Sequence, residues 1–285
     1  MNKAIILDID GVIIGSKEGI NTPLPTVKVI DKLRVIQDNG IPVCLCTGRA
    51  SVGIVDIVKE IELDCYHITD CGAITLNPLT NKVFEKHLLE SEEIEKIIKL
   101  ANAHDIDIML NIPLKYYMAN EKKSSLLDVT ATAMYNKKPT FTNDLSQTAK
   151  EEDIIGAVLC VPDMESRKNL EKLLEDLDLN SEIVWTKSML EPDAEFAVIT
   201  AKDISKASAV KKVIEDIGLS LENALGVGDT MGDWVFMEYC GYVGTLGNAD
   251  DELKKLVNER DTRGIIGKSV DENGIIDILD WYMSK

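Results

Sequence analysis

The fold that we expect for this chain is decided by one stretch near its start, Ala4-Ile5-Ile6-Leu7-Asp8-Ile9-Asp10-Gly11. The first four residues are wholly apolar, which is typical of a central strand of a parallel sheet that is buried on both faces. The chain then meets a carboxylate at Asp8 and a second one at Asp10, with Gly11 directly behind. The stretch therefore predicts a buried strand whose end carries polar side chains.

Strands and helices alternate after this stretch. The residues from about Thr26 to Asn39 predict a helix that ends at Gly40, and a second buried strand covers Ile41 to Cys46. The segment from Ser51 to Ile61 predicts a further helix, and a third strand lies around Tyr66 to Thr69. This alternation predicts a right-handed parallel α/β sheet.

The pattern changes near Lys82, where a hairpin surrounds the turn at Asn77-Pro78. Short strands and helices in mixed order then replace the regular alternation. The strands are predicted at 106–110, 116–119, 155–161 and 182–185, and the helices near 126–134 and 166–177. This mixed order predicts an α+β unit inserted into the sheet domain.

Regular alternation returns with a strand at Phe196–Thr200, a helix at Lys206–Ile217 and a strand at Ala224–Gly228. A length of 285 residues also suggests two compact units, since roughly 150 residues is usual for one domain. We therefore expect a Rossmann-like parallel-sheet core of residues 1–81 and 192–285, with an inserted α+β cap of residues 82–191.

The overall charge limits the partners. The 31 Lys and Arg residues face 49 Asp and Glu residues, so the net charge of -18 repels nucleic acid and anionic membranes. No stretch approaches the roughly 18 consecutive apolar residues of a membrane-spanning helix. The six cysteines stand mostly in apolar runs, as buried reduced thiols do. We expect a cytoplasmic protein, and the sequence leaves monomer and homodimer open.

Four polar signals accompany the predicted buried strands. They are Asp8-Ile9-Asp10-Gly11, Thr47-Gly48-Arg49, Lys206 at the start of a helix, and Gly228-Asp229-Thr230-Met231-Gly232-Asp233. In an open parallel sheet the strand ends that lead into such loops lie at one edge, where ligands bind. Residues far apart in the sequence are therefore expected to meet in one crevice.

This crevice would gather the carboxylates of Asp8, Asp10, Asp229 and Asp233. Two carboxylates about 5 Å apart repel by roughly 3 kcal/mol even at an effective dielectric constant near 20. A divalent cation removes that cost, and oxygen ligands suit a hard ion such as Mg²⁺, which prefers one or two carboxylates together with waters and substrate phosphate. The sequence therefore predicts a magnesium site.

The other residues of the crevice suit phosphate. Thr47 and Lys206 can hold phosphate oxygens, and Gly11 lets the backbone approach closely. With the phosphate held, one carboxylate of the Asp-x-Asp pair can attack phosphorus while the other handles the proton of the leaving group. Asp10 is the natural acid and base of the pair.

These motifs resemble, in order, those of the haloacid dehalogenase superfamily, and within it the Cof-like phosphatases with a large cap of the C2 type (IIB). The matching residues are Asp8 and Asp10, Thr47, Lys206, and Asp229 with Asp233; the late loop Gly247-Asn248-Ala249 also matches. The resemblance covers the core, whereas the cap matches by position and element pattern only.

The resemblance implies an aspartyl-phosphate on Asp8, acid and base catalysis by Asp10, and Mg²⁺ bound by Asp8, Asp229 and the backbone carbonyl of Asp10. Asp233 would hold a metal-bound water. Phosphate binding is expected from six residues, namely Gly11, Thr47, Gly48, Arg49, Lys206 and Asn248. The implied activity is hydrolysis of a small phosphorylated metabolite, often a sugar phosphate.

Some features of the sequence leave alternatives open. Gly232 stands where the fourth motif commonly has Asn. Instead of binding phosphate, Arg49 could pair with a core carboxylate, and Asn248 could have the structural role of shaping a loop. A phosphotransferase or mutase would use the same intermediate, and a phospho-accepting or binding protein without turnover would share the acidic pocket.

Overall fold

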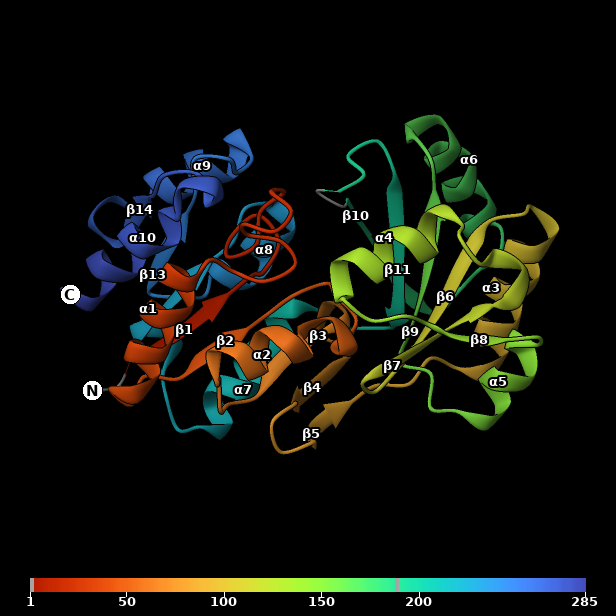
Figure 1. The fold of residues 1–285 in the computed structure, drawn as a ribbon, viewed down its shortest axis with the longest axis horizontal. Helices are drawn as coiled ribbons and strands as arrows, with labels where there is room; N and C mark the ends of the chain where they lie inside the picture. The colour runs from red at the N-terminus through yellow and green to blue at the C-terminus, as the bar shows by residue number, and fades with distance from the viewer. Residues whose placement is uncertain (1–2, 188–189) are drawn as a thin grey trace.

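The computed structural model describes residues 3–187 and 190–285 and shows two bodies side by side, with both chain termini at the outer end of the first (Figure 1). This first body, the core, is built on a five-stranded sheet in the order β14-β13-β12-β1-β2. The strands are β1 (Ala4–Leu7), β2 (Val43–Leu45), β12 (Ala224–Val227), β13 (Tyr242–Thr245) and β14 (Gly264–Ile266). Every neighbouring pair is parallel, which confirms the predicted α/β core.

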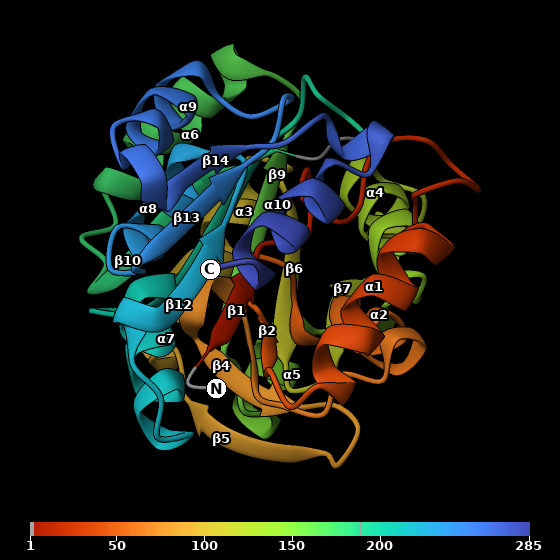
Figure 2. The same ribbon diagram turned by 90° about the vertical axis from the view of Figure 1, so that its left-hand side faces the viewer.

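Helices cover both faces of the core sheet (Figure 2). One layer contains α1 (Val27–Asp38), α2 (Val55–Ile61) and α10 (Gly274–Met283), and the other contains α7 (Lys206–Asp216), α8 (Met231–Met237) and α9 (Asp251–Asn258). In β1, Ile5 and Leu7 pack against the first layer, and Ala4 and Ile6 pack against the second. The apolar run at the start of the chain is therefore buried on both faces, as predicted.

A small antiparallel sheet joins the edge of the core. It has the order β3-β4-β5, with β3 (His67–Thr69), β4 (Ile74–Asn77) and β5 (Lys82–Lys86). A parallel bridge between Cys46 and Ile68 connects it to the end of β2. The predicted hairpin around Asn77-Pro78 is β4-β5.

The second body, the cap, contains a six-stranded sheet in the order β10-β11-β9-β6-β7-β8. Its strands are β6 (Asp107–Ile112), β7 (Lys115–Ala119), β8 (Thr140–Thr142), β9 (Gly156–Val161), β10 (Ser181–Thr186) and β11 (Glu195–Ala201). Its helices are α3 (Ser91–Ala103), α4 (Leu126–Tyr135), α5 (Leu145–Glu151) and α6 (Met164–Glu175). α4 shares a hydrophobic cluster with Ala50, Val52 and Cys71 of the core, so this helix lies between the two bodies. Across the described residues, no helix has the length and apolar character needed to span a membrane.

One prediction about the topology is wrong. The strand at Phe196–Thr200 was expected to resume the core sheet, but β11 pairs with β9 and β10 in the cap sheet. Alternate residues of β11 enter two different hydrophobic clusters, Ala197 and Ile199 on one face and Phe196 and Val198 on the other. Burial on both faces gives the same continuous apolar run in either sheet, so the sequence does not reveal the partner. The core therefore resumes with α7, later than the predicted residue 192. At the other boundary, β5 (Lys82–Lys86) pairs with β4 and so lies beside the core, although it follows the predicted end of the core at residue 81.

His67 holds the edge of the core sheet together. Its Nδ1 accepts a hydrogen bond from the backbone N–H of Leu45 at 3.1 Å, and its Nε2 lies 3.2 Å from the carbonyl oxygen of Leu63. The neutral ring with a proton on Nε2 satisfies both contacts. Burial lowers the pKa of His67 from 6.5 to about 4. The imidazole is therefore held neutral at the point where β2 and β3 meet.

We expect His67→Asn to change how stability depends on pH, because Asn can accept the Leu45 hydrogen bond but does not titrate. Between pH 6.5 and 4 the unfolded chain binds a proton at His67 that the folded chain does not, so this contribution to stability is lost as the pH falls. The free energy of unfolding of the wild type, relative to the variant, should fall by roughly 2 kcal/mol from pH 7 to pH 5. Urea unfolding at both pH values measures this difference, with His104→Asn at an exposed position as the control. An unchanged difference would contradict the buried neutral role.

Candidate active site

Three neighbouring parallel strands bring the predicted site residues together. In the sheet register Leu7 lies beside Val227 on one side and Leu45 on the other. The residues that follow these strand ends are Asp8 after β1, Thr47 after β2, and Asp229 after β12. α7 begins with Lys206, and α8 carries Asp233 in its first turn. The structure thus gathers the four polar signals at one edge of the sheet.

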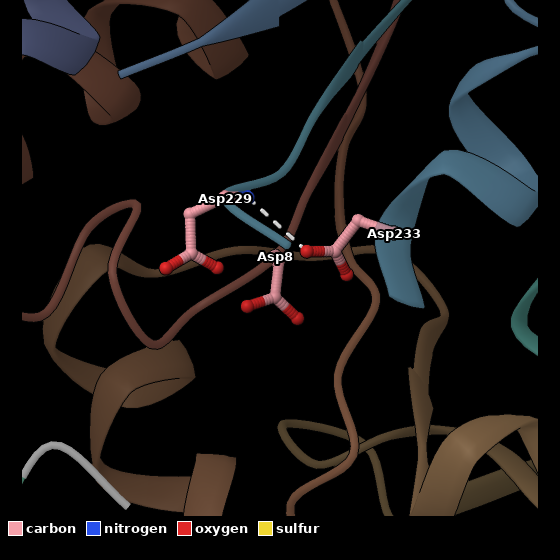
Figure 3. Close-up of side chains that lie close together, drawn as sticks. All are labelled: Asp8, Asp229 and Asp233. Carbon is pink, nitrogen blue, oxygen red and sulfur yellow. Dashed lines mark hydrogen bonds between the residues drawn. The ribbon is translucent and has the colours of Figure 1, made fainter. Parts of the chain in front are cut away.

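Three carboxylates form the centre of this site (Figure 3). Asp8, Asp229 and Asp233 each offer an oxygen atom, and these atoms all lie within 4.8 Å of one another. Burial, followed by the charge of Asp233, raises the pKa of Asp8 to about 7, although Lys206 opposes the shift. Burial and the charges of Asp8 and Asp233 likewise raise the pKa of Asp229 well above its usual range. Burial and the closeness of the carboxylates therefore both oppose ionisation in this cluster.

Lys206 is the cation that contacts this cluster. Its Nζ donates to Asp8 Oδ1 at 2.8 Å and to Asp233 Oδ1 at 2.7 Å. Burial by itself lowers the pKa of Lys206, but the charges of Asp233 and Asp8 outweigh it and raise the pKa well above its usual range. The ammonium group therefore stays protonated between two carboxylates.

Asp233 also holds the loop that follows β12. Its Oδ2 accepts hydrogen bonds from the backbone N–H groups of Asp229 and Thr230, both at 3.1 Å, and the first of these is drawn in Figure 3. With Oδ1 on Lys206, both oxygens of Asp233 have protein partners. Asp233 thus orients Asp229 and Lys206 toward Asp8.

At Gly232 a Cβ atom would meet only the Thr230 hydroxyl at 3.4 Å, so the position has room for the side chain that it lacks.

The loop after β1 needs glycine at Gly11. Its φ is +76°, in the left-handed region, and a Cβ atom there would overlap the carboxylate of Asp229. Asn248 fixes the same loop, since its Nδ2 donates to the Gly11 carbonyl at 2.9 Å and its Oδ1 accepts from the Val270 N–H at 2.8 Å. Both polar ends of Asn248 therefore contact backbone, as expected of the loop-shaping alternative.

The second predicted motif contributes a buried pair of side chains. Thr47 is 1% exposed, and its Oγ1 accepts a hydrogen bond from the backbone N–H of Arg49 at 3.1 Å. The guanidinium of Arg49 pairs with Asp10 through two hydrogen bonds, Nε to Oδ2 at 2.7 Å and Nη2 to Oδ1 at 2.6 Å. Of the two alternatives for Arg49, the structure shows the pair with a core carboxylate. Gly48 lies between them, partly exposed.

One residue that positions the site was not among the predicted ones. Gly72 has a φ of +108°, and a Cβ atom on it would overlap the backbone carbonyl of Ser205, the residue before Lys206. This close approach sets where α7 begins relative to the end of β3. The stretch Asp70-Cys71-Gly72 directly after the strand His67–Thr69 is the signal that could have pointed to it.

Known proteins resemble this chain in sequence and in fold. A family model described as haloacid dehalogenase-like hydrolase matches residues 5–279. A 5-amino-6-(5-phospho-D-ribitylamino)uracil phosphatase of Bacillus subtilis is 24% identical over 253 residues, which cover 89% of this chain and 87% of that protein. The crystal structure of a haloacid dehalogenase-like hydrolase from Bacteroides thetaiotaomicron superposes with a TM-score of 0.81 and 22% identity, covering 98% of this chain and 99% of the other.

A solved sugar phosphatase of haloacid dehalogenase subclass IIB also shares the fold, with a TM-score of 0.75, 18% identity and 99% coverage of both chains. The match therefore extends over core and cap together, and the predicted resemblance is confirmed. On the family match to residues 5–279, this chain belongs to the haloacid dehalogenase-like hydrolases.

Proposed function

We propose that this protein is a Mg²⁺-dependent phosphohydrolase that acts through an aspartyl-phosphate on Asp8. One observation carries the proposal: the carboxylate of Asp8, at the end of β1, belongs to an acidic cluster and accepts a hydrogen bond from the ammonium of Lys206. A carboxylate in this place can attack phosphorus while a cation on one side and an ammonium on the other stabilise the phosphoryl oxygens. The membership in a hydrolase family supports the same chemistry.

In the first step, an oxygen of Asp8 forms a bond to phosphorus, and the bond from phosphorus to the leaving oxygen breaks. Asp10 gives a proton to that oxygen. In the second step Asp10 takes a proton from water, the water oxygen bonds to phosphorus, and the bond to Asp8 breaks. Inorganic phosphate leaves and both carboxyl groups return to their starting states.

The residues at the sheet edge fit a magnesium ion. Their donor atoms are all oxygens, which suit a hard cation. Burial and the negative charge of neighbouring carboxylates raise the pKa values of Asp8 and Asp229. We assign Asp8, Asp229 and the carbonyl of Asp10 as ligands, with Asp233 behind them. A bound Mg²⁺ would offset this charge and that of the substrate phosphate.

Phosphate binding is proposed for the groups that surround Asp8. Lys206 and Thr47 supply side chains, and Gly11 and Gly48 supply backbone at close range. Arg49 and Asn248, which were predicted to bind phosphate as well, contact Asp10 and loop backbone instead. We therefore place both outside the phosphate contacts.

The substrate is proposed to be a small phosphomonoester of the sugar or sugar-alcohol type. The name of the Bacillus subtilis relative gives a phosphorylated ribityl compound as its substrate, and the subclass IIB structure is that of a sugar phosphatase. A screen of phosphorylated metabolites with phosphate detection, with Mg²⁺ and with EDTA, tests the proposal. Magnesium-dependent release of inorganic phosphate over many turnovers is expected. Transfer of the phosphoryl group to a sugar hydroxyl, or labelling without turnover, would contradict it.

Asp8→Asn should abolish turnover, because the amide cannot form the acyl phosphate. We expect a loss of at least roughly a thousandfold in kcat with 4-nitrophenyl phosphate, about 4 kcal/mol of barrier. In acid-quenched samples, intact-mass spectrometry should detect one phosphoryl group on the wild type and none on the variant. Asp251→Asn, a change at an exposed carboxylate, is the control. Near-normal turnover by Asp8→Asn would exclude Asp8 as the nucleophile.

Asp229→Asn should stabilise the metal-free protein while removing its response to magnesium. The pKa of Asp229 is higher in the folded protein than in the unfolded chain. As the pH rises above the pKa of the unfolded chain, the folded protein therefore loses stability. The amide of Asn does not ionise and avoids this loss. In EDTA at pH 8 the variant should melt about 3 °C or more above the wild type. Added Mg²⁺ should raise the Tm of the wild type only. Equal magnesium shifts in both proteins would show that Asp229 is not a ligand.

A further inference from the structure

Arg49 joins three parts of the molecule that are distant in sequence. Its side chain is 3% exposed, and two of its nitrogens hold Asp10. The third, Nη1, donates to the carbonyl oxygen of Met134 in α4 of the cap at 2.8 Å, and lies 3.4 Å from the carbonyl oxygen of Gly53. The guanidinium therefore connects the loop after β1, the segment after β2, and the cap.

The pair with Asp10 fixes the direction of that carboxylate. Two parallel N–H···O bonds set the plane of a carboxylate, which a single point charge does not. Each carboxylate oxygen has a second lone pair, so Asp10 can still exchange a proton with a substrate while it is held. Its side chain remains 27% exposed, on the side that Arg49 does not cover.

The contact with the cap depends on where α4 lies. Met134 belongs to the last turn of α4, which carries the negative end of the helix dipole. The end of α4 is anchored on the core by Asp56, which accepts from Asn136 at 3.0 Å and from Lys137 at 2.9 Å. The ring of Tyr135 also fills the space above Gly53, where a Cβ atom would overlap it.

These contacts link the cap to the acid and base of the reaction. If α4 leaves the core, Nη1 loses its 2.8 Å contact with the Met134 carbonyl and keeps only the longer one, 3.4 Å, with the Gly53 carbonyl. The guanidinium would then turn toward water, and the carboxylate that it holds would turn with it. While α4 is docked, the guanidinium of Arg49 is therefore held by Asp10 on one side and by the Met134 carbonyl on the other.

We propose that Arg49 is a positioning residue that orients Asp10 for proton transfer while α4 of the cap is docked on the core. This inference deepens the proposed function and rests on it. Its consequence concerns the leaving group: esters whose leaving oxygen needs a proton depend on Arg49, and esters with a stable leaving anion do so much less.

Arg49→Lys tests the proposal, because lysine keeps the charge but cannot form the two parallel bonds. The probes are phenyl phosphate, whose phenolate benefits from a proton, and 4-nitrophenyl phosphate, whose anion leaves readily. We expect kcat/KM for phenyl phosphate to fall at least about tenfold more than kcat/KM for 4-nitrophenyl phosphate. Equal losses on both esters, or a rise in KM alone, would overturn the positioning role and favour a structural or phosphate-binding one.

The cap contribution is tested at Asp56, which lies outside the catalytic groups. Asp56→Asn removes the carboxylate that anchors α4, and the ratio of the two kcat/KM values should shift in the same direction by about two- to fivefold. Asp153→Asn, which breaks the exposed pair between Asp153 and Lys86 away from α4, is the matched control and should leave the ratio unchanged. No shift in Asp56→Asn would overturn the coupling to the cap.

Two further measurements separate the possible failures. Asp10→Asn should show the selective loss on phenyl phosphate; if it does and Arg49→Lys does not, only the positioning role fails. If the wild type turns over neither ester, the proposed function itself fails.

If Arg49→Lys folds poorly, Arg49→Ala with added guanidinium replaces it. The expected result is that guanidinium restores the turnover of phenyl phosphate only.

Discussion

The electrostatic repulsion between carboxylates beside the ends of β1 and β12 is the constraint on which the site depends. Asp8, Asp229 and Asp233 place oxygens within 4.8 Å of one another, and Lys206 contacts two of the three. Burial, followed by this closeness, raises the pKa values of Asp8 and Asp229. The apolar strands hold the site together, because their parallel register sets the positions of the residues that follow them.

The loops around the strand ends are held mainly through backbone. Asp233 accepts from two N–H groups of the loop after β12, and Asn248 connects the loop after β1 to Val270. Gly11 and Gly72 permit approaches that a side chain would block. These contacts fix the direction of each functional side chain, as preorganisation of a charged site requires. The site is thus built by residues that, for the most part, do not themselves carry the proposed chemistry.

The sequence predicted the parallel core and the meeting of Asp8, Asp229 and Asp233 because the signals there are local. An apolar strand followed at once by Asp8 needs no knowledge of its neighbours, and parallel topology then brings Thr47 and Asp229 beside it. Which strands pair with one another is not a local property. β11 would show the same apolar run in the core sheet as it does in the cap sheet, so its sequence does not identify its neighbours. The short elements β8, β14, α5 and α8 were missed, since three to seven residues give little periodicity. The contact of Arg49 with Met134 was likewise beyond reach, because it joins a side chain to a backbone carbonyl 85 positions away.

The charge of the site also limits how the cap can meet the core. A net charge of -18 and a cluster of carboxylates repel any further negative group, yet α4 presents the carbonyl end of its dipole to this edge. Arg49 makes that contact favourable, since one planar cation binds Asp10 on one side and the α4 carbonyl on the other. A neutral side chain there would leave two like partial charges facing each other without a donor between them. The arginine that orients the acid and base in our proposal therefore also favours the approach of the cap to an acidic site, together with the hydrophobic cluster and the Asp56 contacts of α4.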